Sequence, residues 1–428
     1  MLSLIPNEHW DYDPGDMILG LLDALAIRRT SPDSRISISE VGQCLAVRSA
    51  RAAIVLSLKA LGVRTGGAVA VPLYCCPVVL HAIAESGCRA RFIDVDPDSY
   101  CMSAADLAAK GSEVDAVIAV HMFGNMCDMP ALRKAAPGKP FIEDCAQSLG
   151  SRLDGQVAGS FGEIAVFSFR SGKYISAGEG GAVYSSSTDL QSRVSELIGV
   201  LPTPSCVDEV MHVVKTCLRS MLRSKPLWGL IGSSLWDAYS KKVDCMSQAP
   251  IVLTKTYATD RDMAIRRMTV LPEMIDKQRR NADHYLQSLT VDADMLCRET
   301  PRAFFNRLQF PLLVPTPAQC DRMVSRLRQN QVSTARPYKD IVEIAAAHYG
   351  YRGDCPQAES IASRVLVIPC NYALTTQDVE RISNCVNRTW AEVAGREREA
   401  SLSSKSDSPL IQPQGAKVTP MAEQRHIS

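Results

Sequence analysis

Short apolar runs alternate with helical patterns between residues 68 and 144, and this alternation restricts the fold more than any other feature of the chain. Strands are predicted at 68–71, 90–95, 116–120 and 141–144. Amphipathic stretches between them predict helices at 78–86, 104–110 and 130–136. Strands and helices in this order predict an α/β fold with a mostly parallel sheet flanked by helices. In such sheets, ligands bind beyond the carboxyl ends of the strands.

The stretch 141–181 places one acid and one lysine where such a ligand would lie. Asp144 ends one predicted strand, and Lys173 follows the next strand, 164–169, between Gly172 and a glycine-rich turn. A lysine among small residues suits a Schiff base with an aldehyde cofactor, and the acid suits a protonated ring nitrogen of that cofactor.

Other polar residues are expected to converge on the same crevice. His121, Asp144 and Ser168 all lie at or near strand ends. A helix predicted at 47–61 opens with Ser49, Ala50 and Arg51, where free backbone N–H groups can receive an anion. The chain has neither a GxGxxG motif opening a helix after the first strand nor a P-loop, which argues against a dinucleotide or nucleoside triphosphate site.

Composition excludes several classes of protein. The 428 residues suffice for one large and one smaller domain, and a formal net charge of +1 does not indicate nucleic acid as a partner. The N-terminus does not resemble a signal peptide, and no apolar run is long enough to span a bilayer, so a cytoplasmic protein is expected. The 15 cysteines form no CxxC pair and are interpreted as small buried side chains rather than as a metal site.

Four segments are predicted, one of which contains an insertion. They are an N-terminal extension (1–46), a large ligand-binding domain (47–255) with a helical insertion at about 200–250, a smaller C-terminal α/β domain (256–395) and a polar tail (396–428) expected to be disordered.

The insertion has two interpretations. Residues 210–239 mix apolar side chains with basic ones, such as Lys215 and Arg219, which is compatible with an interfacial membrane helix. Pro226 and several Gly and Ser residues interrupt the pattern, which favours a helix packed on the protein itself or on a partner subunit.

Taken together, motifs spread over most of the chain resemble one family, the pyridoxal 5′-phosphate (PLP)-dependent sugar aminotransferases called the DegT/DnrJ/StrS family, within fold type I. The matching segments are ALGV at 60–63 with VAVP at 69–72, FIDVDP at 92–97, VHMFG at 120–124, IEDCAQ at 142–147, GSFGE at 159–163, FSF at 167–169 with Lys173, GEGG at 178–181 and PQAESIASRVLVIP at 356–369. The resemblance implies a large sheet of the seven-stranded type.

The resemblance also implies roles for individual residues. Lys173 would bind PLP covalently and later move a proton between the substrate carbon and the cofactor, which requires a depressed pKa. Asp144 would pair with the pyridinium nitrogen, and Gln147 would lie at the 3-hydroxyl side of the ring. Ser168 would bind the phosphate with backbone N–H groups near Ser49, Ala50 and Arg51.

Three features depart from the family pattern. Ala50 and Arg51 stand where the family has Gly-Thr. Cys76 occupies the place of the aromatic ring or histidine that stacks on PLP, and His121 is either a packed side chain or one beside the ring. No loop matches the one from which many members donate an asparagine to the neighbouring subunit.

The function implied is a homodimeric aminotransferase that moves an amino group from glutamate onto a nucleotide-linked keto-sugar. One alternative is a PLP-dependent sugar dehydratase, but such relatives replace the lysine with histidine, and Lys173 is present. The other is a non-catalytic regulatory protein on the same fold, supported only by the altered positions at 50–51 and 75–76.

Overall fold

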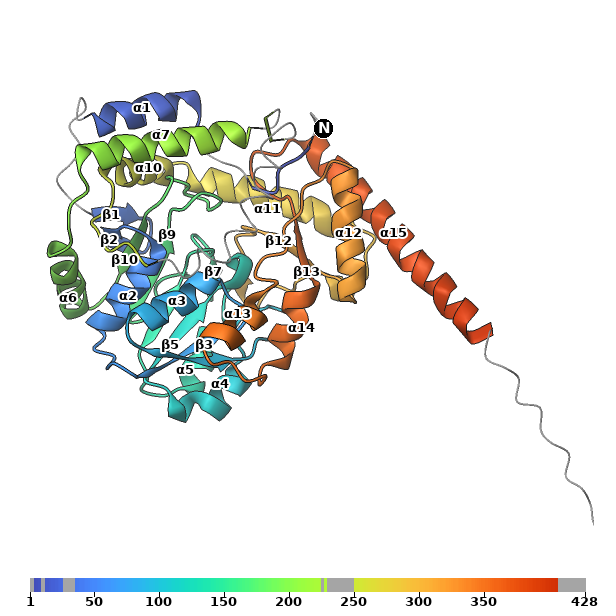
Figure 1. Cartoon of the computed structure of the whole chain (residues 1–428), viewed down its shortest axis with the longest axis horizontal. Helices are drawn as coiled ribbons and strands as arrows, with labels where there is room; N and C mark the ends of the chain where they lie inside the picture. The colour runs from blue at the N-terminus through green and yellow to red at the C-terminus, as the bar shows by residue number, and fades with distance from the viewer. Residues whose placement is uncertain (1–3, 9–11, 26–34, 225–226, 229–249, 407–428) are drawn as a thin grey trace, which may run out of the picture.

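The computed structural model describes residues 4–8, 12–25, 35–224, 227–228 and 250–406. An eight-stranded sheet lies at the centre of the larger part of the molecule, with strand order β1-β2-β10-β9-β6-β5-β3-β4 (Figure 1). Its strands are β1 (Arg35–Ile38), β2 (Gly42–Val47), β3 (Ala68–Pro72), β4 (Arg89–Ile93), β5 (Ala116–Val120), β6 (Phe141–Asp144), β9 (Ile164–Ser168) and β10 (Gly181–Tyr184).

The strands from β9 to β4 are parallel neighbours, whereas β10, β2 and β1 continue the sheet antiparallel. The expected α/β class with a mostly parallel sheet is therefore confirmed, with one strand more than the seven-stranded type. Two small sheets accompany it, made of β7 (Arg152–Leu153), β8 (Gln156–Val157) and β11 (Ala303–Phe304), and of β12 (Phe310–Leu313) and β13 (Val365–Ile368).

The described helices surround these sheets (Figure 1). They are α1 (Pro14–Ala24), α2 (Ala50–Ala60), α3 (Pro77–Glu85), α4 (Ala104–Lys110), α5 (Met129–Ala135), α6 (Thr188–Gly199), α7 (Cys206–Leu222), α10 (Ala258–Met268), α11 (Leu271–Ser288), α12 (Pro317–Gln329), α13 (Ile341–His348), α14 (Pro356–Arg364) and α15 (Thr376–Ser406), with short 3-10 turns η1 (Gly111–Glu113), η2 (Met122–Gly124) and η4 (Ala293–Met295).

Local sequence explains most of these elements. All five residues of β5 are buried, as expected for a central parallel strand covered on both faces. Ser49 caps α2 by accepting a hydrogen bond from the N–H of Ala52, which satisfies one of the free donors of the first turn. Pro272 lies in the first turn of α11, where proline has no hydrogen bond to lose.

The predictions differ from the structure at β2 and at the C-terminus. The helix predicted at 47–61 begins only at Ala50, because Val47 belongs to β2, a strand that was not predicted. The disordered tail predicted from residue 396 is wrong up to Ser406, since α15 continues to that residue and extends away from the body (Figure 1). Residues 407–428 lie outside the described residues.

A second cluster of buried side chains belongs to the C-terminal part of the chain. It includes Tyr285 of α11, Leu312 of β12, Leu327 of α12 and Val386 of α15, and Ile5 of the N-terminal segment joins it. The division of the chain at residues 255 and 256 stays a prediction.

Candidate active site

The carboxyl ends of β5, β6 and β9 lie at one edge of the sheet, because the three strands are adjacent and parallel. Asp144 ends β6 and is buried. Its Oδ1 accepts a hydrogen bond of 3.0 Å from the N–H of Ala146. Burial raises the pKa of Asp144, while that N–H group and the charge of Lys173 oppose the rise. The carboxylate thus lies within electrostatic reach of the lysine.

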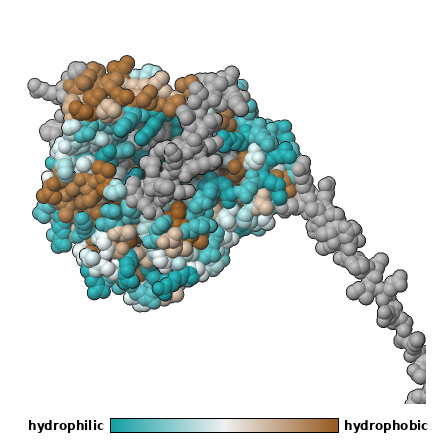
Figure 2. Space-filling model, viewed as in Figure 1, coloured by the Kyte–Doolittle hydropathy of each residue, from teal (hydrophilic) through white to brown (hydrophobic). Residues whose placement is uncertain are grey.

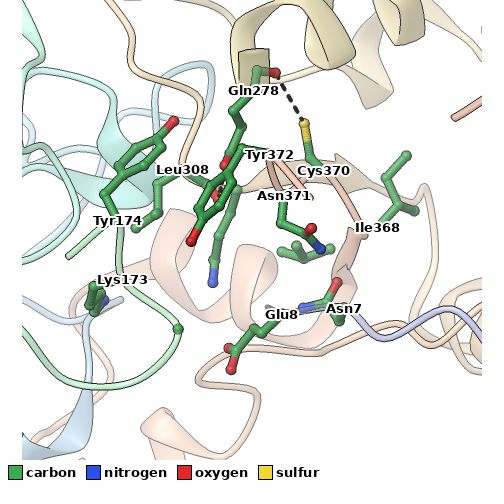
Figure 3. Close-up of a pocket in the computed structure, with 13 residues that line it drawn as sticks. Asn7, Glu8, Lys173, Tyr174, Gln278, Leu308, Ile368, Cys370, Asn371 and Tyr372 are labelled. Carbon is green, nitrogen blue, oxygen red and sulfur yellow. Dashed lines mark hydrogen bonds between the residues drawn. The ribbon is translucent and has the colours of Figure 1, made fainter. Parts of the chain in front are cut away.

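Lys173 follows β9 in a tight loop and lines a pocket (Figure 3). Its N–H donates to the carbonyl of Arg170 over 3.2 Å. The other pocket walls come from four distant regions: the N-terminal residues Asn7 and Glu8, α11 through Gln278, the segment 308–309, and the segments 367–368 and 370–372 around β13. Burial lowers the pKa of Lys173, and the neighbouring acidic groups of Cys76, Asp144 and Glu8 oppose this shift. A depressed pKa is the direction that a reacting amine requires.

Backbone N–H groups that can receive an anion lie at the start of α2. Strand β10 is placed between β2 and β9, with Gly181 paired to Val47 on one side and to Ser168 on the other. A Cβ atom on Gly181 would lie 2.8 Å from the backbone nitrogen of Ala50 and 2.5 Å from the carbonyl oxygen of Phe167. The first turn of α2 therefore comes close to the end of β9 and its half-buried Ser168.

Arg51 adds a cation to this region. Its half-buried guanidinium makes no hydrogen bond or ion pair with any described residue. Burial lowers the pKa of Arg51, and the neighbouring positive charge of Arg170 acts in the same direction. The two cations and the free helical N–H groups attract an anion, and the nearby charge of Glu179, which raises the pKa of Arg51, opposes them in part.

Aromatic side chains lie close to Gln147. Its Oε1 accepts a hydrogen bond of 3.2 Å from the N–H of Phe123, and its Nε2 lies 3.5 Å from the hydroxyl of Tyr338. The rings of Tyr74 and Tyr338 meet edge to face at 5.7 Å. Burial raises the pKa of Tyr338, and the charges of Cys76 and Asp144 add to the rise. Tyr338 was not predicted, because it comes from a segment with no recognised motif.

Cys76 is half-buried at the start of α3 and forms no cap hydrogen bond there. It is close enough to Lys173, Arg51 and Tyr338 to shift the pKa of each. The structure thus brings Cys76 to the site where the family resemblance places a stacking residue.

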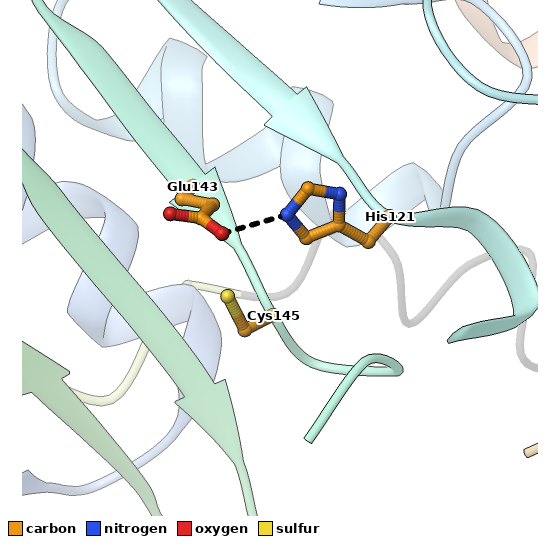
Figure 4. A group of neighbouring side chains, drawn as sticks. All are labelled: His121, Glu143 and Cys145. Carbon is orange, nitrogen blue, oxygen red and sulfur yellow. Dashed lines mark hydrogen bonds and ion pairs between the residues drawn. The ribbon is translucent and has the colours of Figure 1, made fainter. Parts of the chain in front are cut away.

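His121 has a different surrounding from the other predicted site residues (Figure 4). Its Nδ1 accepts a hydrogen bond from the N–H of Cys127 at 3.0 Å, so Nε2 carries the proton and donates it to Glu143 at 2.9 Å. Both ring nitrogens are therefore engaged, and the side chain is fully buried.

Glu143 binds four donors in total. Its Oε1 accepts from His121 and from the N–H of Gly159, and its Oε2 accepts from the N–H groups of Phe161 and Gly162. Burial raises the pKa of Glu143, but the hydrogen bonds outweigh it and the pKa lies below its ordinary value. Cys145 completes the buried cluster. We interpret this cluster as structural, because the hydrogen bonds of Glu143 connect β6 to the 159–162 loop.

Comparison with known proteins decides the family. The sequence profile of the DegT/DnrJ/EryC1/StrS aminotransferase family matches residues 37–209 and 257–387. The chain belongs to this family. The expected cofactor, PLP, is confirmed by this membership. The matched residues include Asp144, Lys173 and the start of α2, whereas α1 and most of α7 lie outside them.

Similar proteins include two curated aminotransferases. The UDP-N-acetyl-3-dehydro-alpha-D-glucosamine 3-aminotransferase of Acidithiobacillus ferrooxidans is 27% identical over 361 residues, covering 82% of this chain and 85% of the relative. The dTDP-3-amino-3,4,6-trideoxy-alpha-D-glucose transaminase of Micromonospora megalomicea is 28% identical over 357 residues, covering 81% and 85%. A sugar aminotransferase structure from Streptococcus pneumoniae, Spr1654, superposes with a TM-score of 0.71 at 16% identity, covering 91% of this chain and 100% of that chain.

The residues of this DegT/DnrJ/EryC1/StrS aminotransferase fit PLP. The cofactor has a phosphate, an aldehyde and a ring nitrogen, and the site has an anion-attracting helix start, a lysine with a depressed pKa and a buried carboxylate. Asp144 has an oxygen without a hydrogen bond to any described residue, which leaves it available for a ring N–H. The helix start, the lysine and the carboxylate therefore match the phosphate, the aldehyde and the ring nitrogen of the cofactor.

Proposed function

We propose that this aminotransferase moves an amino group from glutamate onto a keto-sugar carried on a nucleotide. The observation that carries the proposal is the placement of Lys173 and Asp144 within electrostatic reach of each other beside the start of α2. The sugar class rests on the relatives, of which one is named for a UDP-linked and another for a dTDP-linked amino sugar.

Lys173 acts as the base and acid of the reaction. When bound, PLP supplies an electron sink that acidifies the carbon bearing the amino group. The Nζ of Lys173 takes the proton from that carbon, which requires the neutral amine. It then returns the proton to the cofactor. Burial favours the neutral form, since it lowers the pKa of Lys173. The Asp144 carboxylate would hold the ring nitrogen and favour its protonated form.

The remaining site residues hold the cofactor in place. Ser168 and the backbone N–H groups of Ser49, Ala50 and Arg51 would hold the phosphate, and the Arg51 guanidinium would neutralise part of its charge. Gln147 and Cys76 would contact the ring.

His121 contributes as a positioning residue rather than by contact. Its hydrogen bond to Glu143 fixes the end of β6, directly before Asp144.

We also propose that the enzyme works as a homodimer in the cytoplasm. The free thiols of the described cysteines support a reducing compartment.

Mass spectrometry of reaction products tests the proposal. Purified protein with PLP is offered a panel of UDP-, dTDP- and GDP-linked keto-sugars with glutamate or glutamine. The expected product carries an amine in place of the ketone, and the matched Lys173→Arg variant gives none. A deoxy product would identify a dehydratase, and the absence of any product across the panel would contradict an aminotransferase acting on nucleotide-linked sugars. Turnover with glutamine alone would refute glutamate as donor.

A further inference from the structure

The segment 335–338 reaches the active site from the C-terminal part of the chain. Ala335 exchanges two hydrogen bonds with Val367 of β13, of 3.1 and 2.8 Å. Arg336 donates to a carbonyl of α14 and forms an ion pair with the exposed Asp321 of α12. Figure 2 shows mainly hydrophilic surface where Figure 1 places α12, so Arg336 connects the segment to the outside of the molecule. These contacts attach the segment to the C-terminal part.

Tyr74 attaches the same segment to the larger part of the molecule. Its hydroxyl donates a hydrogen bond of 3.0 Å to the carbonyl of Pro337, and its ring meets the ring of Tyr338 edge to face at 5.7 Å. Tyr74 lies between β3 and α3 and is fully buried. The segment is therefore held from two sides directly before Tyr338.

The backbone of Tyr338 lies in the left-handed region, with a φ of 59°. A residue with a bulky side chain rarely adopts this conformation, because its Cβ atom crowds the neighbouring carbonyl group. Such strain persists where the surrounding contacts impose it, and it gathers at active sites and ligand contacts. The contacts of residues 335–337 thus hold Tyr338 in a conformation that a tyrosine does not favour, with its hydroxyl near Gln147.

The hydroxyl of Tyr338 has an unused hydrogen. The N–H of Phe123 donates to Oε1 of Gln147, which turns the Nε2 group of the same amide toward Tyr338. The hydroxyl oxygen lies 3.5 Å from Nε2 and accepts from it, while the hydroxyl hydrogen has no acceptor among the described residues. The side chain is half-buried. It therefore offers a positioned donor to a bound molecule.

The cofactor does not account for this donor. The helix start, Lys173 and Asp144 match its phosphate, aldehyde and ring nitrogen, and Gln147 would contact its ring. The substrates remain, and charge separates them. The largest charge effects on Tyr338 come from acidic groups, Cys76 and Asp144 among them, and these oppose a carboxylate such as those of glutamate. The sugar of a keto-sugar offers neutral oxygens, which accept a hydrogen bond without this repulsion.

We propose that Tyr338 is a substrate-binding residue whose hydroxyl donates a hydrogen bond to an oxygen of the keto-sugar. The inference rests on the proposed function, because it names a residue that recognises the sugar after glutamate has given up its amino group. A site that hydrogen-bonds a substrate oxygen discriminates strongly against molecules that lack it. Tyr338 therefore contributes to the choice among keto-sugars, but not to cofactor binding or to the reaction with glutamate.

The variant Tyr338→Phe tests this inference, because it removes the hydroxyl and keeps the ring against Tyr74. The protein loaded with PLP is followed by its absorption band in two separate steps. Glutamate is added first, and the keto-sugar that gives most product in the panel is added second. We expect the second-order rate constant with that keto-sugar to fall at least about fivefold, as for a lost hydrogen bond whose partner stays buried.

Two binding measurements accompany the rates. The dissociation constant of the same keto-sugar from the protein loaded with PLP, measured by calorimetry, should rise about fivefold or more in Tyr338→Phe. The affinity for PLP and the rate with glutamate should stay within about twofold of the wild type, because the lost bond is made only to the sugar.

The matched control is Tyr184→Phe. Tyr184 pairs with Ala165, at the end of β9 opposite to Ser168, so its hydroxyl lies away from the carboxyl edge of the sheet. This variant should match the wild type in every measurement. Equal rates of Tyr338→Phe and the wild type with the keto-sugar would overturn the inference.

Other results would overturn the inference in ways that can be told apart. A slower reaction with glutamate would place the hydroxyl at the amino donor, and a weaker affinity for PLP would place it at the cofactor. A melting temperature lowered by several degrees, with both steps slowed, would show a structural role. A wild type that responds to glutamate but aminates no member of the panel would refute the proposed function, and the inference with it.

Discussion

Replacing Glu143 with glutamine keeps the size of the side chain but removes the charge that accepts hydrogen bonds from the 159–162 loop. In the wild type each carboxylate oxygen accepts two hydrogen bonds, from His121 and Gly159 on one side and from Phe161 and Gly162 on the other. Glutamine has one oxygen and one NH₂ group. In either orientation of the amide, two of the four neighbouring donors therefore face the NH₂ group, which cannot accept a hydrogen bond.

The cost follows from this count. A hydrogen bond to a charged group contributes about 1.5–3 kcal/mol, and the side chain is fully buried, so the loss of two such bonds lowers the free energy of unfolding by about 3–6 kcal/mol. The pKa of Glu143 lies below its ordinary value in the folded protein. Its stabilisation is therefore complete above the unfolded pKa of about 4.3 and is lost as the pH falls through the folded pKa.

Urea denaturation followed by circular dichroism measures the effect. At pH 7 the midpoint of Glu143→Gln should fall by about 1 M urea or more, and the gap to the wild type should narrow below about pH 4. The matched control is Glu85→Gln, whose 40% exposed side chain forms a long ion pair of 3.8 Å with His81, so that stability should change by less than about 0.5 kcal/mol. Equal midpoints for Glu143→Gln and the wild type at pH 7 would refute the reasoning.

Three further predictions concern the cofactor. Gly181→Ala forces backbone apart at the start of α2 and should weaken PLP binding at least about tenfold in an absorbance titration, with unchanged affinity refuting the proposed phosphate site. Arg51→Met removes a cation from that site and should weaken binding by roughly tenfold, while Arg51→Lys retains more of it; identical affinities would show that the guanidinium points away. Glu8→Gln removes a negative charge that raises the pKa of Lys173. Because PLP incorporation needs the neutral amine, its pH dependence should move to lower pH in this variant. A shift to higher pH would contradict the electrostatic effect of Glu8 on Lys173.

Much of the fold follows from local patterns. The predicted ranges 104–110, 116–120 and 141–144 coincide with α4, β5 and β6, because continuous apolar runs and helical spacing are properties of neighbouring residues. Asp144 and Ser168 could be placed together because parallel strands bring their carboxyl ends to one edge. Strand β2 was missed since its pairing with β10 joins residues that are far apart in the sequence.

Other features depend on contacts that no local pattern records. Tyr338 and Glu8 approach the site from distant segments, and neither belongs to a motif. The apolar and basic pattern of α7 indicated an amphipathic helix but not which face is buried. The bonds of His212 and Arg223 decide that orientation, and both partners lie in other parts of the chain.

The visible absorption spectrum of the protein reconstituted with PLP tests the central claim most directly. We expect an absorption band from cofactor bound to Lys173 that fades when glutamate is added and returns when a suitable nucleotide-linked keto-sugar follows. Lys173→Ala should lack this band while remaining folded by circular dichroism. A Lys173→Ala protein that keeps the same band, and still responds to glutamate, would contradict the assignment of Lys173 as the cofactor-binding residue.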